Sequence, residues 1–330
     1  MRVAILGNGG FGTAMALTLE RAGHAVSLWG HDADYTKSIA ASRENPRYLS
    51  GVTLPDSIEV TTDPEVALAG VGAVLVAVPT QHVRGVMSRM SGDLGEGVPV
   101  VSMAKGLEQS TGKRPSEILG EVLGGAERVY VLSGPSHAEE IAHGQPTTVV
   151  VAGADGERLL GLQTALQTDR FRVYRNGDLL GVELCGALKN VMALAAGIAD
   201  GLGYGDNAKA AILSRGLVEM QRYGLACGAD PQTFFGLAGV GDLAVTAFSK
   251  HGRNRAFGER IGKGETLQQA LESSPKVAEG VWTAKVVAEV SGARGVEMPI
   301  AAAVARVLYE DLPPAQAVRA LMERDPKAEA

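Results

Sequence analysis

Short apolar segments alternate with helical patterns from residue 1 to about residue 175. Several of these segments are apolar throughout, which is typical of strands covered on both faces of a parallel sheet. Helical patterns at 12–22, 81–90 and 156–167 lie between them and fit crossover helices. The pattern predicts a doubly wound α/β domain, with strands at 2–6, 25–29, 58–61, 73–78, 98–103, 129–133, 147–152 and 171–175.

The strand signals stop after about residue 178, and only helical patterns follow. The chain therefore divides by pattern into an α/β domain at 1–177 and an all-α domain at 178–330. The helices are expected at 179–199, 206–224, 266–273, 281–291, 299–310 and 314–324.

The first apolar segment runs directly into a glycine loop. Gly7, Gly9 and Gly12 have the spacing G-x-G-x-x-G between a predicted strand and a predicted helix. The first glycine permits a tight turn, the second lets the backbone approach a pyrophosphate, and the third lets the helix pack on the strand. The alternative is a turn rich in glycine for flexibility. The context predicts a Rossmann-type, dinucleotide-binding N-terminal domain.

The tip of the second strand bears on the choice of dinucleotide. A fold that selects NAD usually has an acidic residue there, about 20 residues after the loop. Here Gly30 is near that position and His31 follows it. A glycine leaves room for a 2′-phosphate, and a histidine can hydrogen-bond one. Because Asp32 and Asp34 are close by, NAD stays possible, and the sequence favours NADP slightly.

Composition and charge exclude several classes of protein. Hydrophobic residues make up 45% and charged residues 21% of the chain, as in a globular protein. The net charge of −6 argues against nucleic acid as a partner, which would need a basic face. There is no signal-peptide pattern at the start and no uninterrupted apolar stretch of about 18 residues, so no membrane span is expected. With only Cys185 and Cys227, a cytoplasmic location fits best.

Polar motifs follow three of the predicted strands. "VAVPTQHVR" (76–84) and "SMAKG" (102–106) are at strand ends, where ligands bind in a parallel sheet. Lys105 could attract phosphate or polarise a carbonyl, or be a solvated loop lysine. "SGPSHAEEIAHG" (133–144) includes His137 and His143, but their spacing of six does not fit a metal-binding helix. We expect no metal site.

The helical half contains two further candidates. "GVGDLAVTAFSKHGRNRAFG" (239–258) has Asp242 followed by Arg253 and Asn254. Arginine suits bidentate phosphate binding, although a basic surface turn is an equal alternative. "ELCGALKNVMALAAG" (183–197) is an apolar helix in which Lys189 has no carboxylate three or four residues away. Its ammonium could extend to solvent or could serve chemistry.

Taken together and in order, these motifs resemble those of the bacterial NAD(P)-dependent glycerol-3-phosphate dehydrogenase family. The resemblance covers nearly the whole chain. It rests on "GNGGFGTA", "VAVPTQHVR", "SMAKG", "SGPSHAEE", "ELCGALKN", "GVGDL", "GRNRAFG" and "VAEGVWTA". It implies reversible reduction of dihydroxyacetone phosphate to sn-glycerol 3-phosphate for glycerophospholipid synthesis. It also implies a cytoplasmic homodimer.

The resemblance implies roles for particular residues. Lys189 looks like the catalytic acid/base and also contacts substrate. The other implied substrate contacts are Lys105, Gly134, Ser136, Asp242, Gly252, Arg253 and Asn254. The implied cofactor contacts are Gly7, Gly9, Gly10, Phe11, Gly12, His31, Tyr48, Lys105, Ala138, Arg253, Val277 and Glu279.

Three positions depart from the family's usual pattern. Phe11 stands where the family usually has tryptophan, and Asn8 where it usually has alanine. Gly252 replaces the serine that normally precedes the Arg-Asn pair. The last departure removes a hydroxyl from the expected phosphate site, so Gly252 could contribute only its backbone.

The implied mechanism assigns a proton to Lys189. Hydride delivery to a ketone carbon leaves charge on oxygen, which a positioned ammonium can neutralise. Lys105 would stabilise that oxygen or the phosphate. Asp242 would either accept a hydrogen bond from the hydroxyl or orient Lys189. Two other hypotheses remain: a related two-domain dehydrogenase of a hydroxy acid or amino acid, and a non-catalytic protein that senses NAD(P)H.

Overall fold

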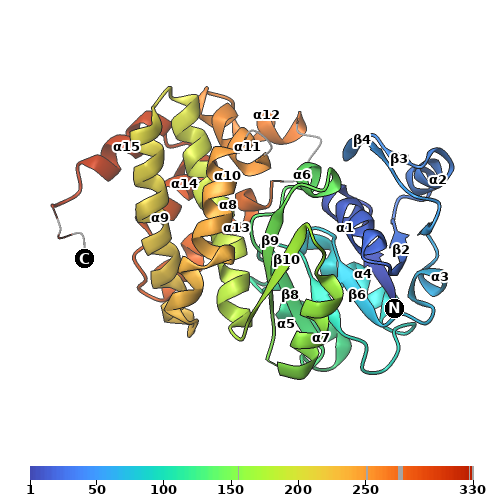
Figure 1. Cartoon of the computed structure of the whole chain (residues 1–330). Helices are drawn as coiled ribbons and strands as arrows, with labels where there is room; N and C mark the ends of the chain where they lie inside the picture. The colour runs from blue at the N-terminus through green and yellow to red at the C-terminus, as the bar shows by residue number, and fades with distance from the viewer. Residues whose placement is uncertain (155, 250–251, 274–277, 327, 329–330) are drawn as a thin grey trace. The chain divides into compact units, whose positions relative to one another are not determined.

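The computed structural model describes the whole chain except residues 155, 250–251, 274–277, 327 and 329–330. It divides into two compact units, Met1–Glu183 and Leu184–Ala330 (Figure 1), and each is described by itself. The last strand ends at Asn176 and the first long helix of the helical half begins at Leu179. The domain limits 1–177 and 178–330 stay a prediction.

An eight-stranded sheet forms the centre of the first unit. Its strand order is β10-β9-β8-β7-β6-β1-β2-β5. All neighbours pair in parallel except β8 and β9, which are antiparallel, and the predicted doubly wound α/β fold is confirmed. The strands are β1 (Arg2–Leu6), β2 (Ala25–Trp29), β5 (Ile58–Thr61), β6 (Ala73–Val76), β7 (Val100–Ser102), β8 (Val129–Ser133), β9 (Thr147–Ala152) and β10 (Phe171–Asn176).

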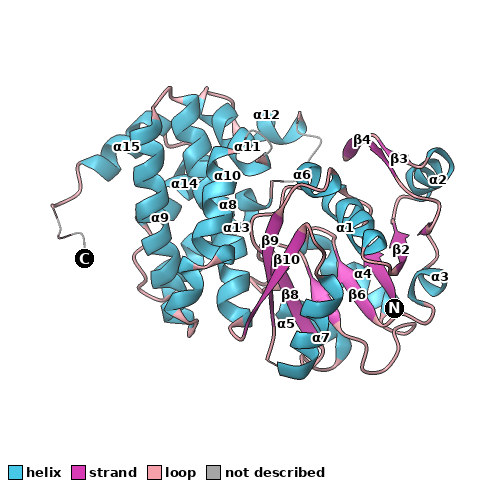
Figure 2. Ribbon diagram, in the orientation of Figure 1, coloured by secondary structure: helices cyan, strands magenta, loops and turns pink. Residues whose placement is uncertain are grey.

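The central strands of the sheet are buried on both faces, with helices on each side (Figure 2), which explains their apolar sequences. In β1, Val3 and Ile5 belong to one core cluster, while Ala4 and Leu6 belong to another. The helices are α1 (Gly10–Arg21), α2 (Ala33–Ser42), α3 (Pro64–Leu68), α4 (Thr80–Met90), α5 (Pro115–Leu123), α6 (Ala138–Ala142) and α7 (Gly156–Leu166). A small hairpin, β3 (Glu44–Asn45) and β4 (Leu49–Thr53), follows α2.

The second unit is helical throughout its described residues. The helix α8 (Leu179–Gly201) begins in the first unit and continues into the second. It is followed by α9 (Asp206–Cys227), α10 (Asp242–Phe248), α11 (Arg253–Gly262), α12 (Leu267–Glu272), α13 (Glu279–Ala293), α14 (Pro299–Tyr309) and α15 (Pro314–Met322). A 3₁₀ helix (Pro231–Phe235) and a π-helical turn (Leu237–Gly241) connect α9 to α10.

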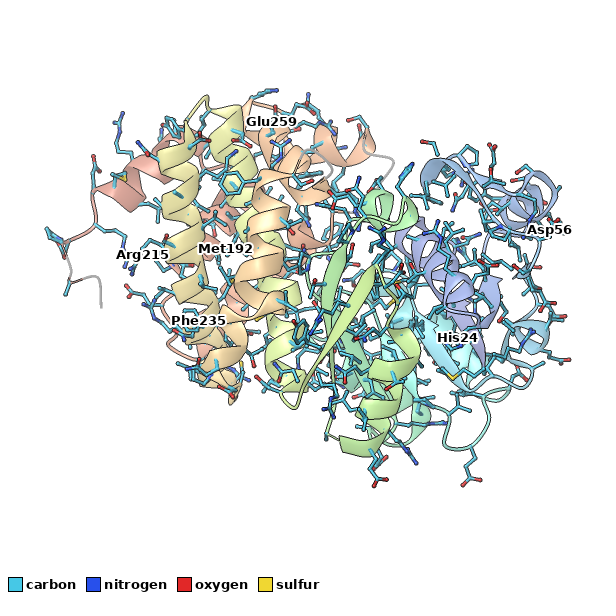
Figure 3. The ribbon with its side chains drawn as sticks, in the orientation of Figure 1. His24, Asp56, Met192, Arg215, Phe235 and Glu259 are labelled. Carbon is cyan, nitrogen blue, oxygen red and sulfur yellow. The ribbon has the colours of Figure 1, made fainter. Side chains whose placement is uncertain are left out.

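The helix α8 is a core helix. It is the one described helix long and apolar enough to cross a membrane, but 89% of its most apolar window is buried inside the protein. Small residues let its neighbours come close: a Cβ on Gly216 of α9 would lie 2.8 Å from the sulfur of Met192 (Figure 3). The apolar stretch around Lys189 is therefore explained by packing.

A buried carboxylate joins α9 to the start of α14. Glu219 is 3% exposed and accepts hydrogen bonds from the backbone N–H groups of Ile300 (2.7 Å) and Ala301 (3.2 Å). Burial raises the pKa of Glu219 to about 7, although the two N–H groups act in the opposite direction. The folded protein therefore keeps a proton that the unfolded chain releases near pH 4.5.

This carboxylate should make stability fall as pH rises from about 4.5 to about 7. Over that window the folded state binds more protons than the unfolded state, and the contribution amounts to about 3 kcal/mol. An amide does not titrate, so the variant Glu219→Gln lacks this loss of stability. The stability of the variant minus that of the unmodified protein should therefore increase from pH 5 to pH 8. Urea denaturation midpoints of both proteins at both pH values check this, and a stability difference that is the same at pH 5 and pH 8 would contradict it.

Candidate active site

A buried lysine–aspartate pair lies at the centre of the helical unit. The ammonium of Lys189, on α8, donates to Asp242 Oδ1 at 2.8 Å and to Thr246 Oγ1 at 2.6 Å. The side chains of Lys189 and Asp242 are only 7% and 3% exposed. Thr246 Oγ1 in turn donates to the backbone carbonyl of Asp242 at 2.6 Å. Lys189 does not extend to solvent, and its carboxylate partner comes from a helix 53 residues away.

The chain before α10 places Asp242. The π-helical turn ends at Gly241, one residue before it. Gly239 in that turn packs so closely on the preceding 3₁₀ helix that a Cβ there would lie 2.0 Å from the carbonyl oxygen of Phe234. Such π turns are frequent at functional sites. In this structure Asp242 is paired with Lys189, as one of the two expected arrangements requires.

The start of the next helix, α11, has no side-chain cap. The first turn of α11 contains no acidic residue, and its N-cap, Gly252, supplies no side-chain cap. Such a start offers free backbone N–H groups and the positive end of the helix dipole. Arg253 is exposed in this turn, whereas Asn254 is buried and accepts a hydrogen bond from the N–H of Gly280 at 3.0 Å.

The glycine at position 252 has a packing reason. A Cβ there would lie 2.8 Å from the carbonyl oxygen of Thr246, so the serine usual in the family would require a shift of the backbone. The same contact puts the start of α11 beside the helix turn that carries Thr246. The start of α11 is thus adjacent to the turn of α10 whose Thr246 side chain bonds the ammonium of Lys189.

The first unit brings together three of the expected substrate contacts. Lys105 Nζ donates to the carbonyl of Gly134 at 2.9 Å and to Ser136 Oγ at 3.3 Å. Ser136 Oγ also donates to that carbonyl, at 2.8 Å. Gly134 has φ +122°, and a Cβ there would lie 3.1 Å from the backbone of Val149, so this turn requires glycine.

Residues that sequence reasoning did not single out hold the loop of Lys105. Glu108 is buried and receives two hydrogen bonds of 2.9 Å from Arg84 on α4. Gln81 donates to the carbonyl of Leu107 and accepts from the N–H of Gln109, both at 2.8 Å. The motif "VPTQHVR" did mark this region, but the sequence carried no signal for the partner of each side chain.

The glycine loop has the geometry that its spacing predicted. Gly7 has φ +121°, and a Cβ on Gly12 would lie 1.9 Å from the carbonyl oxygen of Gly7, so the helix packs tightly on the turn. Gly9 is the N-cap of α1 and has nothing within 4 Å of the position of a Cβ. This open backbone at an uncapped helix start fits a pyrophosphate.

Four further expected cofactor contacts, Gly10, Phe11, Tyr48 and Ala138, lie in or beside this loop. A Cβ on Gly10 would lie 2.8 Å from the carbonyl oxygen of Tyr48 and 3.6 Å from the Cβ of Ala138. Phe11 packs, half-buried, on the same core cluster as Ala138. His31 is exposed after β2.

Of the remaining expected cofactor contacts, Lys105 belongs to the first unit and three others belong to the helical unit. Glu279 is buried as the first residue of α13. Val277 is outside the described residues. Arg253 is exposed as the first residue of α11.

The expectation that Gly30 leaves open space at the tip of β2 was wrong. The space beside Gly30 is not open, because a Cβ there would lie 2.2 Å from both Asn8 Nδ2 and Thr36 Oγ1. These two atoms are themselves hydrogen-bonded at 2.9 Å. The glycine therefore accommodates the side chain of Asn8.

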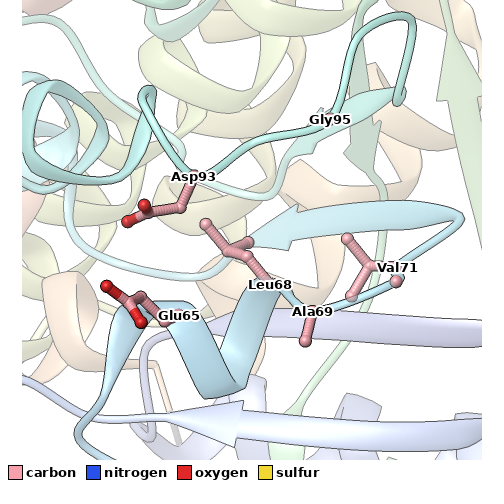
Figure 4. A pocket seen from close by; sticks show the side chains of 7 residues that line it. Glu65, Leu68, Ala69, Val71, Asp93 and Gly95 are labelled. Atoms are coloured by element: carbon pink, nitrogen blue, oxygen red, sulfur yellow. The ribbon is translucent and has the colours of Figure 1, made fainter.

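Other features of the structure lie apart from this chemistry. A hollow of about 320 Å³ is lined by seven residues between α3 and the loop after α4 (Figure 4). Val71 precedes β6, and Asp93 and Gly95 precede β7, so the hollow is at the amino ends of these strands, opposite the glycine loop. Within the described residues, no group of three or more His, Cys, Asp or Glu side chains is arranged to hold a metal ion.

A glycine loop that opens a helix of a doubly wound sheet, with a buried lysine in a helical second unit, defines the class of nicotinamide-dependent dehydrogenases. The family model described as NAD-dependent glycerol-3-phosphate dehydrogenase N-terminus matches residues 2–158, and the corresponding C-terminus model matches residues 178–319. The chain belongs to the NAD-dependent glycerol-3-phosphate dehydrogenase family.

Individual relatives agree over the full length of the chain. A glycerol-3-phosphate dehydrogenase [NAD(P)+] of Prosthecochloris aestuarii is 48% identical over 331 residues, covering 100% of both chains. One of Chlorobium limicola is also 48% identical, covering 100% of this chain and 99% of that protein. The crystal structure of glycerol-3-phosphate dehydrogenase from Coxiella burnetii has a TM-score of 0.93 at 38% identity, covering 98% of this chain and 99% of that one.

Proposed function

We propose that this protein reduces dihydroxyacetone phosphate to sn-glycerol 3-phosphate with NAD(P)H and that it also catalyses the reverse reaction. The observation that carries the proposal is the buried Lys189–Asp242 pair next to the uncapped, acid-free start of α11. This arrangement suits a substrate in which a ketone is close to a phosphate. The product would supply glycerophospholipid synthesis, and the family resemblance supports a cytoplasmic homodimer.

The residues of the chain have separate tasks in this reaction. When bound, the reduced nicotinamide supplies a hydride to the ketone carbon. Lys189 gives a proton to the oxygen of the ketone as it becomes an alkoxide, and takes it back in the oxidation. Asp242 and Thr246 hold the ammonium in place through the bonds described above. Polarisation by lysine makes a metal ion unnecessary in this mechanism.

Binding is assigned to the other groups of the two units. Gly7, Gly9, Gly10 and Gly12 would hold the pyrophosphate of the dinucleotide through backbone N–H groups. Arg253 and the N-terminus of α11 would hold the substrate phosphate. Lys105, fixed by Gly134 and Ser136, would neutralise charge on the substrate.

A substrate panel tests the proposal against its alternatives. Nicotinamide absorbance is followed with dihydroxyacetone phosphate, unphosphorylated dihydroxyacetone and pyruvate, using NADH and NADPH in parallel. We expect fast oxidation with the phosphorylated ketone only, and sn-glycerol 3-phosphate as product. Preference for pyruvate would support a hydroxy-acid dehydrogenase instead. Dinucleotide binding without turnover of any substrate would support a sensor.

Arg253→Ala should raise the KM for dihydroxyacetone phosphate by about 10- to 100-fold, because a charge-assisted bond to phosphate is worth roughly 1.5–3 kcal/mol. The kcat/KM for unphosphorylated dihydroxyacetone should stay within about twofold. Initial-rate measurements on both ketones check this, with Arg89→Ala on the exposed side of α4 as the control. Equal losses on both ketones would argue against phosphate binding by Arg253.

A further inference from the structure

The side chain of Asn8 occupies the space beside Gly30, the position where an acidic residue would select NAD. NAD-selective folds usually place an acid at the tip of the second strand to bind the ribose 2′-hydroxyl. At Gly30 any side chain would collide with Asn8 Nδ2 and Thr36 Oγ1 at 2.2 Å. An acid at position 30 would therefore require the hydrogen-bonded side chains of Asn8 and Thr36 to shift.

The nearest carboxylate beyond Gly30 is already engaged. Asp32 caps α2, and its Oδ1 accepts a hydrogen bond from the N–H of Tyr35 at 3.0 Å. That bond, with smaller contributions from Arg47 and His31, holds the pKa of Asp32 below its usual value. The other oxygen of Asp32, Oδ2, is 3.5 Å from Arg47 Nη1. The N–H of Tyr35 and the guanidinium of Arg47 together orient this carboxylate.

A fixed cation lies beside this strand tip. The guanidinium of Arg47 lies 4.1 Å from the ring centroid of Tyr35 and 5.9 Å from that of Tyr48. Its side chain is 53% exposed, and its pairing with Asp32, which is 41% exposed, is long. The guanidinium therefore retains donors that can reach a ligand, since exposed pairs of this kind are weak.

Buried hydrogen bonds tie this cation to the glycine loop. Asn45, fully buried, donates to the carbonyl of Asn8 at 2.8 Å and accepts from the hydroxyl of Tyr35 at 2.6 Å. That hydroxyl also accepts from the N–H of Arg47 at 3.0 Å. In the loop itself, a Cβ on Gly10 would lie 2.8 Å from the carbonyl oxygen of the next residue, Tyr48. Arg47 is thus held near both the strand tip and the expected pyrophosphate site.

We propose that Arg47, with the exposed His31, binds the 2′-phosphate of the adenosine ribose and makes the protein prefer NADP(H) to NAD(H). At position 30 the chain has glycine, and the side chain of Asn8 fills the space beside it, so no carboxylate stands there. The proposal rests on the proposed function, because it concerns the dinucleotide that the glycine loop would bind. It assigns a role to Arg47, whose guanidinium lies against the rings of Tyr35 and Tyr48. It also gives a role to Asn8, which stands at a loop position where the family usually has alanine.

The test measures binding instead of turnover. Dissociation constants for NADPH and NADH are determined from nicotinamide fluorescence on the unmodified protein, on Arg47→Gln and on the control Arg89→Gln. We expect the unmodified protein to bind NADPH at least about 10-fold more tightly than NADH. Arg47→Gln should weaken NADPH binding about 10-fold or more and NADH binding less than about twofold, while the control changes neither.

Other outcomes overturn the proposal in distinguishable ways. Equal weakening of both dinucleotides by Arg47→Gln would place Arg47 against a part that they share, such as the adenine. Equal affinities of the unmodified protein for NADPH and NADH would remove the preference itself. Failure to bind either one would refute the proposed function and the inference resting on it. A thermal-shift comparison of 2′,5′-ADP with 5′-ADP on the unmodified protein gives an independent readout, and equal stabilisation by both would also overturn the proposal.

Discussion

Lys189→Met is expected to lower kcat for the reduction of dihydroxyacetone phosphate by about 10²–10⁴, the range of general acid–base catalysis. The variant removes the only proton donor that we assign to the substrate oxygen. NADPH and NADH should still bind with near-normal affinity, because the glycine loop belongs to the other unit. Steady-state kinetics and fluorescence titration check the two parts of this prediction, and near-normal turnover would contradict it.

The aspartate partner supplies a matched comparison. Lys189→Met leaves the carboxylate of Asp242 buried without its cation, which costs stability on the order of 3–5 kcal/mol. The double variant Lys189→Met/Asp242→Asn removes that charge and should recover most of the stability without recovering activity. Recovery of turnover in the double variant would show that the single variant fails through folding and not through loss of the proton donor.

Gly258→Ala should destabilise the protein by about 3 kcal/mol or more, in the upper range for overpacking. At the crossing of α8 and α11, a Cβ on Gly258 would lie 2.2 Å from the carbonyl oxygen of Leu194, and one on Gly197 would lie 2.0 Å from that of Arg255. Both contacts are with backbone, which cannot move aside as a side chain can. Thermal unfolding of the variant should show a clear loss of stability.

Gly292→Ala is the matched control for this prediction. Gly292 is in helix α13 of the same unit, is exposed, and has nothing within 4 Å of a Cβ. Alanine there should stabilise the protein by up to about 1 kcal/mol through helix propensity. The same substitution thus has opposite signs at the two glycines, and similar melting temperatures for both variants would contradict the close helix crossing.

Strands buried on both faces were predictable from sequence, because nothing in their environment requires a polar residue. The direction of β9 was not predictable in this way. The connection from Ser133 to Thr147 contains one helix of five residues, and β9 runs antiparallel to β8. Connection length does not explain this direction, because the connection from Thr61 to Ala73 also contains one five-residue helix and joins two strands that pair in parallel with their neighbours. The apolar sequence of β9 carries no signal of its direction.

Polar and short elements were also missed. The helix α11 contains two glycines and many charged residues, so its pattern has little apolar periodicity, and its stability comes from the glycine crossing with α8. The hairpin of β3 and β4 is mostly exposed and is connected to the glycine loop by Asn45. Both depend on contacts between distant parts of the sequence.

Residue types in the candidate site could be predicted, but their partners could not. Lys189 stood out as a charge in an apolar helix, and Asp242 as an acid in a glycine-rich turn. Their pairing spans 53 residues, and that of Arg84 with Glu108 spans 24, so no local pattern contains either. The hydrogen bonds of Asn8 with Thr36 and Asn45 span 28 and 37 residues, so no local pattern contains them either.

Rescue of Lys189→Ala by small primary amines tests the central claim, proton transfer by Lys189, most directly. A cavity in place of the lysine stem should admit methylamine or a similar amine, and reduction of dihydroxyacetone phosphate should recover in part. At equal concentrations of the ammonium form, amines of lower pKa should give faster reduction, because the proton is given up in the rate-determining step. No recovery with any amine, or recovery that does not depend on amine pKa, would contradict Lys189 as the proton donor.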